Sequence, residues 1–143
     1  MTKVLFACVH NAGRSQMARA WFEELADPAL AKAISAGTEP AEQVHPEVKA
    51  VMAELGMDLS QVTPQYLTDE LAAGCELLIT MGCGEVCPVV PGLRREDWPL
   101  VDPKGQSLAD VRVICEAIRQ RVAGLLEREG WAWSAKESPR PLR

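Results

Sequence analysis

The segment VLFACVHNAGRS, residues 4–15, joins an apolar run to a stretch with helical periodicity. The run predicts a short buried strand over Lys3 to Ala7, and an amphipathic helix is expected after Ser15. A tight loop between a strand and a helix directs several backbone amides toward one point, where the helix dipole adds positive potential. The spacing Cys8-x5-Arg14 places a thiol and a guanidinium at that point, and arginine can bind two oxygens of an oxyanion at once. The loop is therefore predicted to hold a tetrahedral oxyanion in front of a thiolate nucleophile.

The predicted oxyanion-binding loop consists of Val9, His10, Asn11, Ala12, Gly13, Arg14 and Ser15. Asn11 and Gly13 suit a tight loop because both tolerate a left-handed backbone. Ser15 is expected both to cap the following helix and to donate a hydrogen bond to the thiolate. His10 is interpreted as a packing or surface residue of the loop, and general-base catalysis by it is kept as the alternative.

Strands alternate with helices along the rest of the chain. Further strands are expected at 31–36, 77–80 and 96–101, and further helices at 46–55, at 63–73 and from 108 to about 125. Alternation of this kind predicts an α/β fold: a doubly wound, four-stranded parallel sheet with helices on both faces, in three layers. We expect a single catalytic domain over residues 1–133, followed by a mobile C-terminal tail at 134–143.

Three chemistry-bearing residues follow predicted strands directly. Cys8 follows the first strand, Cys83 the third and Asp102 the fourth. Because ligands of such sheets bind beyond the carboxyl ends of the strands, these residues are expected to converge on one site. Asp102, held in a loop by Pro103, is the predicted general acid that protonates a leaving oxygen.

The chain has five cysteines, an odd number, and no recognisable export signal, so permanent disulfides are not expected. Cys83 and Cys87 lie on a glycine- and proline-containing loop and are interpreted as resolving thiols. A single C-x3-C pair with remote histidines does not provide the four ligands of a zinc site, so no metal is predicted. Cys75 and Cys115 are interpreted as small core residues.

The composition is that of an ordinary soluble domain: 143 residues, 48% hydrophobic, 24% charged, with a net charge of −5. An acidic chain without a basic run is not expected to bind nucleic acid or an anionic membrane. No apolar run approaches the roughly 18 residues of a membrane span. We therefore expect a cytoplasmic protein, and a monomer.

The run Cys8-x5-Arg14-Ser15-Gln16-Met17-Ala18, with Asp102-Pro103, resembles the low-molecular-weight protein tyrosine phosphatase superfold. The pair Cys83 and Cys87 resembles that of the thioredoxin-coupled arsenate reductases built on this fold. The resemblance implies that Cys8 attacks arsenate, for which phosphate or sulfate is an analogue, while Arg14 and the loop amides hold its oxygens. It further implies that Asp102 protonates the departing hydroxide.

The same resemblance implies a disulfide relay. Cys83 attacks Cys8 and releases arsenite, and Cys87 then attacks Cys83. An external thiol reductant, thioredoxin or a glutaredoxin-like protein, would reduce the resulting disulfide, and no cofactor would be bound.

Three alternatives remain open from the sequence. The chain could transfer arsenate to a small thiol of the mycothiol type. It could be a phosphatase in which water resolves a phosphocysteine, although Cys83 and Cys87 have no part in that mechanism. It could also be a binding or redox-sensing module, in which Asp102 would be dispensable.

Overall fold

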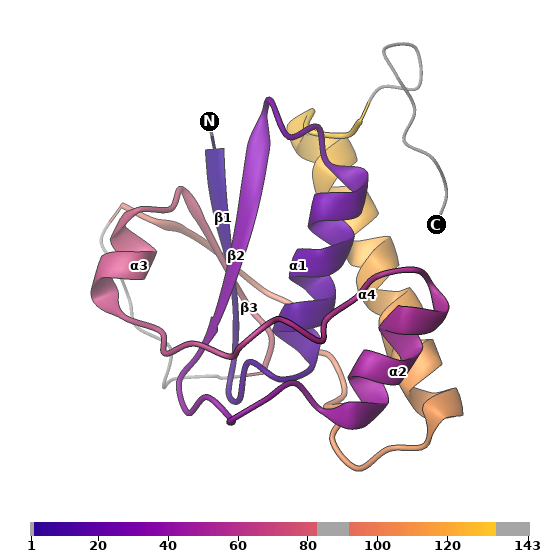
Figure 1. Cartoon of the computed structure of the whole chain (residues 1–143). Helices are drawn as coiled ribbons and strands as arrows, with labels where there is room; N and C mark the ends of the chain where they lie inside the picture. The colour runs from indigo at the N-terminus through magenta and orange to yellow at the C-terminus, as the bar shows by residue number, and fades with distance from the viewer. Residues whose placement is uncertain (1, 83–91, 134–143) are drawn as a thin grey trace.

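The computed structural model describes residues 2–82 and 92–133, and its strands and helices alternate along most of the chain (Figure 1). In chain order the elements are β1 (Thr2–Cys8), α1 (Arg14–Leu25), β2 (Ala31–Gly37), α2 (Pro46–Glu54), α3 (Asp69–Ala73), β3 (Leu77–Thr80), β4 (Arg94–Asp97) and α4 (Leu108–Glu129). Cys83, Cys87 and the tail predicted at 134–143 lie outside the described residues. Within the described ranges, no helix is long and apolar enough to cross a membrane.

The four strands form one sheet in the order β2-β1-β3-β4, and every pairing is parallel. At the carboxyl end of β1, Ala7 pairs with Thr80 of β3 and Cys8 pairs with Gly37 of β2. The chain leaves β1 toward β2 on one side and returns on the other side for β3. The carboxyl end of β1 is thus the point where the winding reverses, which is where open α/β sheets bind ligands.

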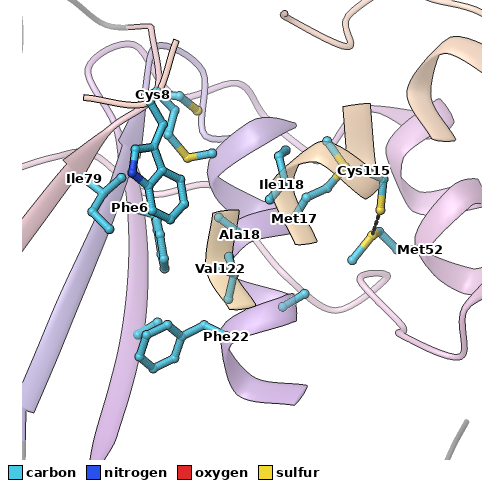
Figure 2. Close-up of a cluster of buried hydrophobic side chains, with 14 of the residues drawn as sticks. Phe6, Cys8, Met17, Ala18, Phe22, Met52, Ile79, Cys115, Ile118 and Val122 are labelled. Carbon is cyan, nitrogen blue, oxygen red and sulfur yellow. Dashed lines mark hydrogen bonds between the residues drawn. The ribbon is translucent and has the colours of Figure 1, made fainter. Parts of the chain in front are cut away.

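Helices cover both faces of the sheet, so the predicted three-layer α/β fold is confirmed (Figure 1). Side chains of α1, α2 and α4 pack with alternate residues of β1 and β3, including Phe6 and Ile79, in the larger hydrophobic core (Figure 2). The smaller core lies on the α3 side and contains Leu5, Leu78 and Ala72. Fully burying each large apolar side chain stabilises the fold by about 1.5–3 kcal/mol.

Cys115 of α4 lies inside the larger core, as predicted for a small core residue (Figure 2). Its Sγ accepts a hydrogen bond from Trp21 Nε1 at 3.3 Å and lies 3.6 Å from Met52 Sδ. Burial raises the pKa of the Cys115 thiol, which keeps it in the unreactive thiol form.

Trp98 also belongs to this core. Its ring lies 5.7 Å from the ring of Phe6 and the residue is buried. Its contribution is therefore to packing.

The helix predicted from 63 to 73 is wrong in its first half. Gly37 N donates to Gln65 O at 2.9 Å and Leu67 N donates to Gly37 O at 2.8 Å, so this stretch runs extended beside the end of β2. The helix itself begins after Thr68, whose side chain accepts a hydrogen bond from Leu71 N.

The fourth strand is also displaced from its predicted position. It was expected at 96–101, where the apolar residues lie, and it occupies Arg94–Asp97 instead. β4 is an edge strand held by its backbone, and its mostly exposed charged side chains protect that edge from pairing with other chains.

Candidate active site

The loop between β1 and α1 has its carbonyl groups turned outward, toward residues 38–45. The carbonyls of Cys8, Val9, His10 and Ala12 accept hydrogen bonds from the backbone amides of Thr38, Glu39, Ala41 and His45, respectively, at 2.8–3.2 Å. Within residues 2–82 and 92–133, no hydrogen bond is donated by the amides of residues 9–13. Outward carbonyls leave these amides available to an anion inside the loop.

Asn11 fixes the shape of the loop. It is fully buried and has a left-handed backbone, with φ of 51°. Its Oδ1 accepts from Gln65 N at 2.9 Å and from Gln16 Nε2 at 3.1 Å, and its Nδ2 donates to Ser15 Oγ at 2.7 Å. The backbone conformation that the sequence predicted for Asn11 is thus held by three hydrogen bonds of its own side chain.

Ser15 Oγ lies 2.9 Å from Cys8 Sγ, and both residues are buried. Because Asn11 donates its N–H to Ser15 Oγ, the hydroxyl proton of Ser15 is free to point at the sulfur. The predicted contact with the thiol is therefore present. The predicted cap is not, since the N-cap of α1 is Gly13 and α1 has no side-chain cap.

Arg14 and Asp102 meet at the mouth of the loop. Arg14 Nη2 lies 3.8 Å from Asp102 Oδ2, and Arg14 Nη1 donates to Leu100 O at 3.0 Å. The Arg14 side chain is 9% exposed, whereas the Asp102 side chain is 45% exposed and accepts a hydrogen bond from Lys104 N at 3.0 Å. The fold thus brings Asp102 to the loop, with one side open to solvent, where a leaving oxygen could be protonated.

Two glycines allow neighbouring segments to approach the loop closely. A Cβ on Gly37 would lie 2.6 Å from Val9 O and 2.9 Å from Asn11 N. A Cβ on Gly13 would lie 2.6 Å from Pro103 Cγ. The loop is therefore packed closely between the end of β2 and the segment that carries Asp102.

The two histidines lie at the outer side of the loop. His10 Nδ1 lies 3.1 Å from Glu39 O, which is the packing contact preferred from the sequence. His45 immediately precedes α2 and lies beside Gly13, a proximity that the sequence did not indicate.

Burial lowers the pKa of His45 below its usual value. The charges of Glu47 and Asp102 act in the opposite direction, and those of His10 and Lys104 add to the lowering. The only sequence signal at His45 is the Pro46 that follows it, and this signal indicates the start of a helix.

Several other predicted residues can be placed. Cys75 lies in the smaller core, its Sγ is 3.3 Å from Leu71 O, and burial raises its pKa, all consistent with a core residue.

Within residues 2–82 and 92–133 no group of His, Cys, Asp and Glu could hold a metal ion. A pocket of about 460 Å³ lies elsewhere, between α1, β2 and residues 57–62, and no predicted site residue lines it.

Comparison with known proteins gives consistent results. A protein-family model described as low molecular weight phosphotyrosine protein phosphatase matches residues 3–132. The putative arsenate reductase of Halobacterium salinarum is 40% identical over 132 residues, which make up 88% of this chain and 92% of that protein. The glutaredoxin arsenate reductase of Synechocystis sp. is 36% identical over 131 residues, 90% of this chain and 98% of that protein.

Among solved structures, the thioredoxin-dependent arsenate reductase of Corynebacterium glutamicum is similar with a TM-score of 0.76 and 38% identity. The match covers 90% of this chain and 61% of that one, so this chain spans less than two thirds of that structure's length.

Proposed function

This chain belongs to the low molecular weight phosphotyrosine protein phosphatase family, among the arsenate reductases of that fold, and from that membership we propose that it reduces arsenate to arsenite. Cys8 is the nucleophile, Arg14 and the amides of residues 9–15 bind the oxyanion, and Asp102 is the general acid. Cys83 and Cys87 are the resolving thiols.

The observation that carries this proposal is the convergence of three groups at the carboxyl end of β1. Cys8 Sγ lies 2.9 Å from Ser15 Oγ, and the guanidinium of Arg14 lies 3.8 Å from the Asp102 carboxylate. A nucleophile, an oxyanion ligand and an acid thus lie around one loop whose amides are available.

The proposed reaction proceeds in three steps. The Cys8 thiolate forms a bond to arsenic and a hydroxide leaves as water, with the proton supplied by Asp102. The Cys83 thiolate then attacks Cys8 Sγ, and the sulfur–arsenic bond breaks with its electron pair on arsenic, which leaves as arsenite. The Cys87 thiolate attacks Cys83 and frees Cys8 as a thiolate.

Arsenic takes its two electrons as the Cys8–Cys83 disulfide forms, and exchange with Cys87 then leaves the oxidation on the Cys83–Cys87 pair. The proposed reaction therefore needs an external thiol reductant and no bound cofactor. Two similar proteins are named for such reductants, one for thioredoxin and one for glutaredoxin. We propose thioredoxin as the reductant of this chain. The alternative reductant is a small thiol together with a glutaredoxin-like protein.

The test is arsenite production from arsenate with thioredoxin, thioredoxin reductase and NADPH, for the wild type, Cys83→Ser and Cys87→Ser. The wild type should turn over, and each variant should stop after one event at most, because the relay lacks a sulfur. Cys115→Ser is the matched control, since this thiol lies in the core, away from the loop; its turnover should be kept.

Other outcomes select the alternatives. Turnover only with a small thiol and a glutaredoxin-like protein would identify an arsenate–thiol transferase. Hydrolysis of aryl phosphates without arsenite formation would identify a phosphatase.

A further inference from the structure

We propose that Gly82 is a positioning residue for Arg14: its missing side chain makes the space in which the guanidinium lies and from which it binds the oxyanion. The proposal rests on the proposed function in one respect, that Arg14 is an oxyanion ligand. It concerns Gly82 alone, the last described residue before 83–91.

The contact is with the charged end of the arginine. A Cβ built on Gly82 would overlap Arg14 Nη1, and would lie 3.1 Å from Cζ and 3.5 Å from Nη2. All three nearest atoms therefore belong to the guanidinium, with Nη1 the nearest to Gly82. Gly82 is also in the left-handed region, with φ of 98°, which disfavours any other residue there.

The guanidinium also has two polar partners from the segment after β4. Nη1 donates to Leu100 O at 3.0 Å, and Nη2 lies 3.8 Å from the carboxylate of Asp102. Arg14 is thus enclosed between Gly82, the second residue after β3, and the segment after β4, and it is 8% exposed. A methyl group at position 82 would push the guanidinium out of the only place where it has both partners among the described residues.

Such a displacement should be tolerated by the fold, because the atoms in the way are the end of a flexible side chain and not backbone. What it changes is the position of a bidentate ligand. Gly82→Ala is therefore expected to damage oxyanion binding far more than stability, which separates positioning from a general structural effect.

The experiment measures the affinity for inorganic phosphate, from the protection that phosphate gives Cys8 against alkylation, followed by mass spectrometry of the Cys8 peptide. Gly82→Ala should weaken phosphate binding by about tenfold to a hundredfold, the loss expected for hydrogen bonds to a charged group. Gly130→Ala is the matched control. Gly130 ends α4, has φ of 77°, and a Cβ there would meet nothing within 4 Å. It should lower the melting temperature like Gly82→Ala and leave phosphate affinity within about twofold of the wild type.

A second pair of variants tests the route through Arg14. In an Arg14→Ala background the obstacle is gone, so adding Gly82→Ala should weaken phosphate binding no further. If Gly82→Ala proves much less stable than Gly130→Ala, the variant that carries both Arg14→Ala and Gly82→Ala should regain the lost stability, because the guanidinium that the new methyl group meets is absent.

Wild-type phosphate affinity in Gly82→Ala, or an equal further loss in the Arg14→Ala background, would overturn the proposal. An Arg14→Ala variant that binds phosphate as the wild type does would instead contradict the proposed oxyanion site itself.

Discussion

Asp102 is the half-exposed carboxylate that lies beside the buried guanidinium of Arg14, at 3.8 Å. Its other oxygen accepts a hydrogen bond from Lys104 N, and this bond holds the carboxylate on the loop side of the turn. A carboxyl group held in this way can donate a proton to a leaving oxygen without helping to activate the Cys8 nucleophile.

Replacing Asp102 with asparagine should therefore slow arsenate reduction by about 10²–10⁴-fold, the usual contribution of a general acid. The rate of Cys8 alkylation should stay near that of the wild type, because the Ser15 contact is kept. Asp97→Asn is the control: Asp97 is exposed and accepts from Thr80 Oγ1 at 2.7 Å. Equal turnover in Asp102→Asn and the wild type would remove Asp102 from the mechanism.

Individual residues were predictable where their chemistry is local. The Cys8-x5-Arg14 spacing predicted the loop, the left-handed position at Asn11 and the contact of Ser15 with the thiol. The cap was mispredicted because α1 begins at Arg14, so that Ser15 lies inside the first turn and Gly13 takes the N-cap position.

The helices and strands differ in how far their positions can be predicted from their own residues. β1 and α4 follow hydrophobic patterns and were predicted well. The segment 64–67 begins with Pro64 and therefore resembles the start of a helix. Its backbone nevertheless pairs with Gly37, which is far away in the sequence. Likewise β4 has charged residues that give no strand signal, and it is held by pairing with β3. Long-range pairing overrode local propensity in both cases.

Gly37 shows how one strand end supports the loop. Gly37→Ala places a Cβ against the backbone of Val9 and Asn11, which cannot move aside. We expect a loss of about 1–3 kcal/mol in the free energy of unfolding, as for other overpacked sites, together with loss of phosphate protection of Cys8. Urea unfolding and the alkylation assay measure the two effects.

The control for this substitution is Gly124→Ala in α4, where a new Cβ meets nothing within 4 Å. Removing a glycine from a helix interior should raise stability by about 0.5–1 kcal/mol. A Gly37→Ala variant that behaves like Gly124→Ala would mean that the end of β2 does not constrain the loop.

The molecule as a whole assembles its site from four separated segments: the loop, residues 38–45, Gly82 and residues 100–103. The doubly wound parallel sheet and the edge of the sheet that carries the site were predictable, because parallel α/β sheets follow general rules of winding. Contacts such as those of His45 and Pro103 with Gly13 were not, because they depend on the packing of distant segments.

His45 makes the stability of the whole molecule depend on pH. Its pKa is lowered by burial, so below about pH 6.5 the unfolded chain binds more protons at this site than the folded chain does. The free energy of unfolding should therefore fall as the pH drops from 7 to 5.

His45→Gln should flatten this dependence, since α2 has no side-chain cap to lose at this position. Urea unfolding at several pH values measures both proteins, which should show parallel behaviour between pH 7 and 8. The same slope below pH 6.5 in both proteins would contradict this account.

The contact of Pro103 with Gly13 has a consequence for biosynthesis. Residue 103 is added about 90 residues after Gly13, which takes roughly 5 to 20 s at typical rates of translation. Until the end of that interval a ribosome-bound chain contains the cysteine and the complete loop sequence but lacks Pro103, which lies against Gly13 in the finished fold. The proposed oxyanion site would thus be completed only late in translation, and a chain truncated before residue 100 would contain the Cys8-x5-Arg14 loop without Asp102 and Pro103.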